Sequence, residues 1–266
     1  MVVLIVNGCY YYYDIQGDGE ETILFSHGLL WSGKVFQAQV EHLKKKYRVI
    51  TYDHRGQGRS EVTEAGYDMD SLCDDTIQLI ERLGFGKVHF VGLSMGGFIG
   101  LRVAARRPDL IQSLILMGTS AQAEPYSLKY KVLILLLKLF GMKSVSRKVM
   151  KIYFADNFRN DNARRDQYEF WKREIEANPK TVIKAVDGVL NRKGVESELA
   201  NIRCPTLIMV GDNDMVTPPE RAKLIHQHID HSILKYIPNA GHTPGIEEPA
   251  LCNQYIDEFL ASQHAH

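Results

Sequence analysis

One serine of the chain stands in a pattern that is typical of a catalytic nucleophile. The residues Gly92-Leu93-Ser94-Met95-Gly96 match G-x-S-x-G, a nucleophile elbow whose strained turn lifts the serine oxygen clear of the backbone. The motif needs a strand before the serine and a helix after it, and the sequence predicts both, at 88–93 and 98–107. A serine hydroxyl is a poor nucleophile at neutral pH, so Ser94 needs a base and a group that orients the base.

Candidates for these two groups follow two later strands. Asp212 and Asp214 come directly after a strand predicted at 205–210, and His242 follows the strand predicted at 232–237. The chain order of serine, then acid, then histidine is the one expected for a nucleophile elbow. Because the carboxyl ends of parallel strands share one edge of a sheet, residues this far apart in sequence can meet there. Either aspartate could be the acid.

The elements that must position these residues alternate between strand and helix. Apolar segments that predict strands occur at 22–26, 47–52, 88–93, 111–117, 205–210 and 232–237. Helical patterns occur at 35–46, 71–83, 98–107, 218–229 and 248–261. Residues 2–15 predict two early strands or one hairpin. The strand, helix and strand between 87 and 117 form a parallel βαβ unit, so we expect an α/β fold with a mostly parallel, doubly wound sheet.

The strand rhythm stops after residue 120 and resumes only after residue 200. Helical patterns fill residues 121–200, which predicts an inserted helical cap, with residues 1–120 and 201–266 forming the core. The segment 128–140 is strongly apolar but too short to span a bilayer. It is expected to be a cap helix that lines an apolar pocket, with an interfacial membrane helix as the alternative.

Composition excludes several classes of partner. The chain of 266 residues carries 32 basic and 32 acidic residues, so no overall charge favours nucleic acid or an acidic membrane, and a small-molecule substrate is expected. The four cysteines are scattered, without C-x-x-C spacing, which argues against a zinc site and a disulfide framework; they are Cys9, Cys73, Cys204 and Cys252.

Other signals for cofactors and targeting are also weak. Gly56 and Gly58 do not complete a G-x-G-x-x-G motif, so no dinucleotide cofactor is expected. His226 and His228 lie two apart on a predicted helix and point to different sides, so no metal is expected either. The first residues lack the features of a secretory signal, and no segment is long enough for a membrane span. These patterns favour a cytoplasmic protein.

Taken together, five motifs in a fixed order resemble those of the α/β-hydrolase superfamily. The motifs, spread over nearly the whole chain, are His27-Gly28-Leu29, Asp53-His54-Arg55-Gly56-Gln57-Gly58-Arg59-Ser60, Gly92-Leu93-Ser94-Met95-Gly96-Gly97, Gly211-Asp212-Asn213-Asp214 with Pro218, and Gly241-His242. Within the superfamily, the elbow is similar to that of the capped 3-oxoadipate enol-lactonases and related small carboxylesterases.

The resemblance implies a role for each site residue. Ser94 would attack a carbonyl carbon, and His242 would take its proton and later return it to the leaving alkoxide. The family has its acid at the fourth position of a G-x-x-D turn, which selects Asp214. Negative charge on the carbonyl oxygen would be stabilised by two backbone N–H groups, of Leu29 and Met95.

The expected function is therefore a serine hydrolase that cleaves a small carboxylic ester or lactone. The apolar helices of the cap favour an apolar acyl or aromatic group. Two alternatives stay open, because an intact triad fits both: a receptor or regulatory protein that retains the triad to bind a signal molecule, and a carbon-carbon bond hydrolase or lyase.

Overall fold

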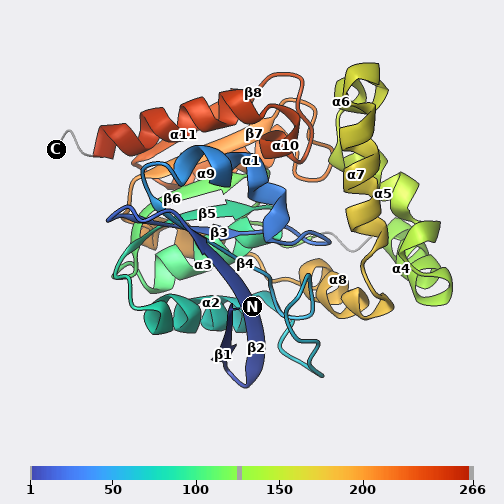
Figure 1. Cartoon of the computed structure of the whole chain (residues 1–266), viewed down its shortest axis with the longest axis horizontal. Coiled ribbons are helices and arrows are strands. Elements are labelled where there is room, and N and C mark those ends of the chain that lie inside the picture. The colour runs from blue at the N-terminus through green and yellow to red at the C-terminus, as the bar shows by residue number, and fades with distance from the viewer. Residues whose placement is uncertain (1, 125–127, 264–266) are drawn as a thin grey trace.

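A single mixed sheet organises the molecule. The computed structural model describes residues 2–124 and 128–263, and within them eight strands hydrogen-bond in the order β1-β2-β4-β3-β5-β6-β7-β8 (Figure 1). Their bounds are β1 Val2–Val6, β2 Cys9–Gln16, β3 Thr22–Ser26, β4 Arg48–Tyr52, β5 Val88–Leu93, β6 Ile111–Met117, β7 Thr206–Gly211 and β8 Ser232–Ile237.

Strand direction confirms the expected α/β class. All pairs from β4 to β8 are parallel, and only β1 with β2 and β2 with β4 run antiparallel. Residues 2–15, where two strands or one hairpin were expected, form a hairpin. Asn7 and Gly8 turn it with positive φ angles of 46° and 72°, the backbone that a two-residue hairpin turn requires.

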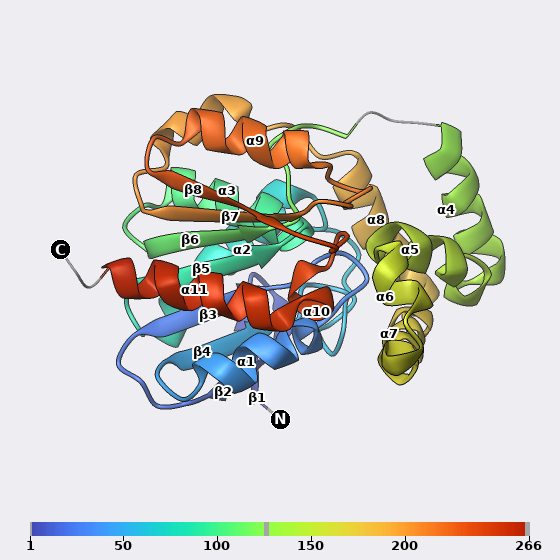
Figure 2. The same cartoon turned by 90° about the horizontal axis from the view of Figure 1, so that it is seen from above.

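Helices cover both faces of the sheet, which is why the central strands are apolar along their whole length. Every residue of β3, β5 and β7 is buried. Helices α1 (Gln37–Leu43) and α11 (Pro249–Gln263) pack on one face, and α2 (Met69–Leu83), α3 (Met95–Arg106) and α9 (Pro219–His228) pack on the other (Figure 2).

Two helix boundaries show how local chemistry sets the elements. The helix expected from residue 71 begins two residues earlier, because the Asp68 side chain accepts a hydrogen bond from the Ser71 N–H and caps the first turn. At the other end Gly84 ends the helix in the left-handed conformation, with φ 72°. The helix expected from residue 98 begins at Met95, immediately after the candidate nucleophile.

A helical segment connects β6 to β7 and lies beyond one end of the strands in both views (Figures 1 and 2). It contains α4 (Leu128–Phe140), α5 (Ser146–Tyr153), α6 (Asp156–Asn160), α7 (Arg165–Glu176) and α8 (Ile183–Leu190), with the short 3-10 helices η2 (Met142–Ser144), η3 (Asn162–Arg164), η4 (Lys180–Val182) and η5 (Glu196–Asn201). Helices thus replace strands there, as expected, while the division into core and cap domains stays a prediction. Among the described residues no helix has the length and apolarity to cross a bilayer.

Candidate active site

The turn that carries Ser94 is strained, and its neighbours allow the strain. Ser94 has φ 51° and ψ −111°, a backbone conformation that residues with a side chain rarely adopt. A Cβ atom on Gly92 would lie 2.5 Å from the carbonyl oxygen of Gly96, and one on Gly96 would overlap the backbone of Ser26. The two glycines therefore let the strand, the turn and the helix approach one another closely around Ser94.

A continuous chain of hydrogen bonds links three of the expected residues. Ser94 Oγ lies 2.9 Å from His242 Nε2, and His242 Nδ1 lies 2.9 Å from Asp214 Oδ2. All three residues are buried, although the shortest sequence separation among them is 28 residues. Because a carboxylate only accepts, Nδ1 carries the hydrogen of the neutral imidazole, and Nε2 is left to accept the Ser94 proton.

The structure distinguishes the two aspartates by position. Asp214 is buried, and its carboxylate also accepts hydrogen bonds from the backbone of Val216 and from both the backbone and the hydroxyl of Thr217. Asp212 is exposed and accepts a hydrogen bond from the Asn213 side chain. Only Asp214 of this pair reaches His242, with an orientation that its three other donors hold.

The backbone groups of Leu29 and Met95 lie on two segments that approach Ser94. Met95 is the first residue of α3, so its N–H is one of the groups that find no acceptor within the helix. The preceding loop comes close as well, because a Cβ on Gly28 would lie 3.3 Å from Ser94 Cβ. Leu30 has a positive φ of 68°, which turns the chain directly after Leu29.

Gln57, which the sequence did not single out, connects these two segments. Its Oε1 accepts a hydrogen bond from the Leu30 N–H at 2.9 Å, and its Nε2 donates to Met95 Sδ at 3.7 Å. A buried amide without partners would be costly, so these two bonds hold the loop and the start of α3 together. Its place within the motif 53–60 was the only signal in the sequence.

Glu247 likewise fixes the turn that carries His242. Its carboxylate accepts hydrogen bonds from the backbone of Gly241, Thr243 and Ala155 at 2.8–3.2 Å, and from the Thr243 hydroxyl at 3.1 Å. Burial raises the pKa of Glu247, while these hydrogen bonds oppose the rise. Since Ala155 belongs to the helical segment, Glu247 joins that segment to the turn at His242.

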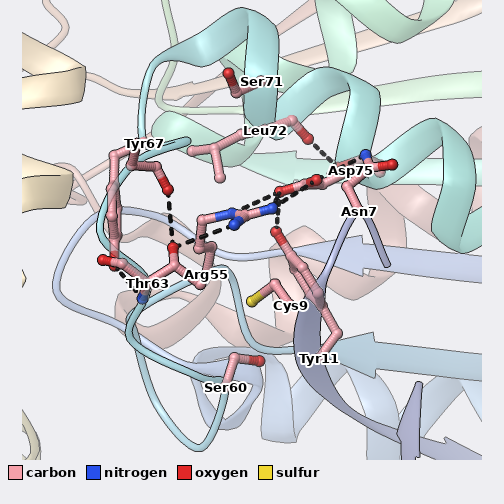
Figure 3. A network of polar contacts seen from close by, with 12 residues as sticks. Asn7, Cys9, Tyr11, Arg55, Ser60, Thr63, Tyr67, Ser71, Leu72 and Asp75 are labelled. Carbon is pink, nitrogen blue, oxygen red and sulfur yellow. Dashed lines mark hydrogen bonds and ion pairs between the residues drawn. The ribbon is translucent and has the colours of Figure 1, made fainter. Parts of the chain in front are cut away.

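A buried ion pair joins Arg55 of the loop 53–68 to Asp75 of α2 (Figure 3). Arg55 donates two hydrogen bonds of 2.9 Å to Asp75 of α2, and Tyr11 of β2 donates its hydroxyl to the same carboxylate at 2.5 Å. Arg55 also donates to the hydroxyl of Thr63 on the loop itself. The network therefore ties the loop that contains Gln57 to a helix and a strand of the core.

His27 and His54 serve as hydrogen-bonding groups behind the site. His27 Nε2 accepts from the His54 N–H at 2.9 Å, and His27 Nδ1 lies 2.7 Å from the Gly28 carbonyl oxygen. His54 Nε2 lies 3.0 Å from Ser26 Oγ. Burial lowers the pKa of both imidazoles, and for His54 the drop is large. Both histidines therefore stay neutral at neutral pH.

This burial predicts a dependence of stability on pH. Below about pH 6.5 the unfolded chain binds protons on His27 and His54 that the folded chain excludes. The free energy of unfolding should therefore fall as the pH drops from about 6.5 towards the folded pKa values, by up to about 1.4 kcal/mol per pH unit for each histidine. Urea unfolding between about pH 5 and 8 measures this slope.

Two variants assign the slope to the buried histidines. His54→Gln should unfold with a flatter pH dependence, whatever its stability at neutral pH. His228→Gln, at an exposed position on α9, should keep the wild-type slope. An unchanged slope in His54→Gln would contradict the assignment.

Aromatic side chains from the helical segment lie beside the histidine. The Tyr153 ring is centred 5.2 Å from the His242 ring and 5.8 Å from Trp31, and the Tyr153 hydroxyl donates to the Leu29 carbonyl oxygen. Trp31 in turn packs edge-on against Trp171 of α7, at 5.4 Å. Aromatic rings thus extend from His242 through Tyr153 and Trp31 to Trp171. In the described part of the chain, no three His, Cys, Asp or Glu side chains group together as metal ligands.

Comparison with known proteins adds a family and several relatives. A family model of the alpha/beta hydrolase fold matches residues 21–249. The chain is 30% identical over 243 residues to the protein named "Putative carbamate hydrolase RutD" of Agrobacterium fabrum, covering 90% of this chain and 92% of that one.

Two solved structures are similar over nearly their whole length. A thermophilic esterase from Thermogutta terrifontis superimposes with a TM-score of 0.89 at 28% identity, covering 99% of this chain and 98% of that one. The enol-lactonase from Burkholderia xenovorans LB400 gives a TM-score of 0.91 at 25% identity, covering 98% and 100% of the two chains.

Proposed function

Since this chain belongs to the α/β-hydrolase fold family, we propose that it is a serine hydrolase that cleaves a small carboxylic ester or lactone. The observation that carries the proposal is the hydrogen-bonded series from Ser94 through His242 to Asp214. An esterase and an enol-lactonase among the similar structures support the same substrate class.

The geometry fits a two-step acyl transfer. Ser94 Oγ adds to the carbonyl carbon while His242 Nε2 takes the hydroxyl proton, and Asp214 stabilises the resulting imidazolium. The backbone N–H groups of Leu29 and Met95 bind the oxyanion, each lowering the barrier by about 3–4 kcal/mol. The tetrahedral intermediate then collapses and expels the alkoxide, which takes the proton from His242 Nε2. The acyl group stays bonded to Ser94 Oγ.

Water completes the reaction by the same steps. His242 removes a proton from a water molecule that attacks the acyl carbon, and it then returns a proton to Ser94 Oγ as the acid departs. A lactone follows the same course, except that its alkoxide and acyl parts leave as one hydroxy acid. No metal or organic cofactor enters this scheme.

The acyl group is expected to be apolar, and residues 121–200 are proposed to act as a cap that selects it. Tyr153 and Trp171 of the helical segment, with Trp31 of the core, supply an aromatic environment next to His242. Esters whose acyl group is butyryl or carries a phenyl ring should therefore react faster than acetyl esters.

Carbamates are a second candidate substrate class, supported by the 30% identity to the RutD relative. Their cleavage also begins with attack on a carbonyl carbon.

Pre-steady-state hydrolysis of p-nitrophenyl esters tests the proposal. An acyl-enzyme mechanism with slow deacylation gives a burst of about one p-nitrophenol per enzyme, followed by steady turnover. The intact mass of the quenched enzyme should rise by the mass of one acyl group. Peptide mapping should locate that group on the peptide that contains Ser94. Matched p-nitrophenyl carbamates in the same assay rank the two substrate classes. Failure to turn over any ester or lactone would refute the hydrolase proposal.

A further inference from the structure

Helix α4 turns a row of apolar side chains towards solvent. Val132, Leu135, Leu139 and Phe140 are 50–67% exposed. The spacing of three and four residues keeps Val132, Leu135 and Leu139 along one side of the helix, and Phe140 is its last residue. Leu137 lies on the other side and belongs to the buried core of the molecule. In both views α4 lies at the outer edge of the helical segment, farthest from the sheet (Figures 1 and 2).

The apolar row lies within the most basic part of the chain. Residues 128–151 contain seven lysine or arginine residues and no acidic residue, whereas the whole chain is neutral. Five of these basic side chains are described and exposed: Lys138, Lys143, Arg147, Lys148 and Lys151. Such a charge asymmetry marks a surface that attracts anions.

The basic surface continues beyond α5. Arg147 and Lys151 line one side of a hollow of about 450 Å³, and Arg159, Arg165 and Lys172 line it further. Glu169 also borders this hollow and pairs with Arg165 and Lys172, while Arg159 pairs with Asp156 outside it. Among the residues that the structure describes, Arg147 and Lys151 form no ion pair with an acidic side chain. Positive charge therefore extends over α5, α6 and α7 of the helical segment.

The helical segment combines exposed apolar and exposed basic side chains, and nucleic acid, a protein surface and an anionic bilayer differ in how well they match both. Nucleic acid would pair with the cations but would leave the leucines in water, and the core of a protein interface is depleted in lysine. At the surface of an anionic bilayer, apolar side chains enter the boundary of the acyl chains while lysines stay near the headgroup phosphates. We propose that α4 and the adjoining basic helix α5 dock this protein on anionic lipid surfaces.

Flotation with lipid vesicles tests the docking directly and does not depend on hydrolysis. The wild-type protein should float with vesicles of equal parts phosphatidylglycerol and phosphatidylcholine, should stay unbound with phosphatidylcholine alone, and should be released by raised salt. The pair Leu135→Glu with Leu139→Glu should weaken binding at least about tenfold, since it removes apolar contact and adds repulsion. The pair Lys138→Glu with Lys143→Glu should weaken it similarly, at about fivefold or more for each lysine lost.

Control variants separate α4 from general surface effects. Ile233→Glu on β8 and Lys223→Glu on α9 each replace one exposed apolar or lysine side chain by glutamate elsewhere, and both should bind vesicles like the wild type. All the variants should keep the wild-type circular dichroism spectrum and Tm, because the changed side chains are exposed.

Three results would overturn the proposal. They are no binding to anionic vesicles, equal binding to neutral ones, and full binding by both the leucine pair and the lysine pair. Sedimentation velocity tests the alternative that a second copy of the chain covers this side of α4. If the wild type forms a dimer that the leucine pair splits, and no vesicle binds, then a second copy of the chain covers α4.

Discussion

Ser94→Ala is expected to lower kcat for p-nitrophenyl butyrate by about a millionfold, while KM changes little. The variant keeps the backbone donors and the apolar surroundings, so substrate can still bind, but no atom remains to form the acyl-enzyme. The wild-type enzyme should also react with a fluorophosphonate: Ser94 Oγ bonds to phosphorus, fluoride leaves, and the serine proton is released. The peptide that contains Ser94 should gain the mass of the phosphonyl group, and the variant should not react.

The matched control for this experiment is Ser262→Ala. Ser262 lies in the last turn of α11, where its hydroxyl donates to the Phe259 carbonyl oxygen. Its replacement should leave both kcat and labelling unchanged. If Ser94→Ala instead retained a tenth of the wild-type kcat, Ser94 would not be the nucleophile and another group would have to supply it.

Asp214→Asn should have the second-largest effect, a loss of about ten thousandfold in kcat. An amide in place of the carboxylate cannot stabilise the imidazolium, and its NH₂ group favours the histidine tautomer with the hydrogen on Nε2. That tautomer points a proton at Ser94 and cannot accept one. Steady-state kinetics at several pH values measure the loss.

The neighbouring Asp212→Asn is the control, because it makes the same chemical change two residues away on an exposed side chain. Its kcat should stay within about twofold of the wild type, as is usual for surface positions away from the reacting groups. An Asp214→Asn enzyme with full kcat would exclude Asp214 as the acid, and a large loss in Asp212→Asn would point to its neighbour instead.

The local parts of this fold could be predicted because neighbouring residues determine them. The elbow at Ser94 requires glycine at 92 for a steric reason that acts within five residues, and the left-handed Gly84 ends α2 through its own backbone conformation. The steric reason for Gly96 is the backbone of Ser26 in β3, which only the folded sheet brings close. The apolar runs of β5 and β7 predict strands covered on both faces. Helix starts were less predictable, since the cap at Asp68 depends on a side-chain hydrogen bond.

Supporting residues could not be predicted, because their partners lie far away in the sequence. Gln57 bonds to Leu30 across 27 residues, and Glu247 bonds to Ala155 across 92. Apart from the place of Gln57 within the motif 53–60, their sequence neighbours do not mark these two residues as different from other polar residues in loops. Their roles exist only once the sheet has brought its loops together at one edge.

The fold was thus determined by the sequence itself, through the alternation of apolar strands and amphipathic helices. The spacing of glycines and the order of Ser94, the aspartates and His242 predict the reaction class that we propose. Only the tertiary structure decided which side of α4 faces water. Residues 132–137 are apolar all round, so periodicity cannot distinguish a helix that lines a pocket from one that lies at the surface. Packing against the rest of the chain buries Leu137 and leaves Leu135 exposed, and that choice depends on contacts between distant segments.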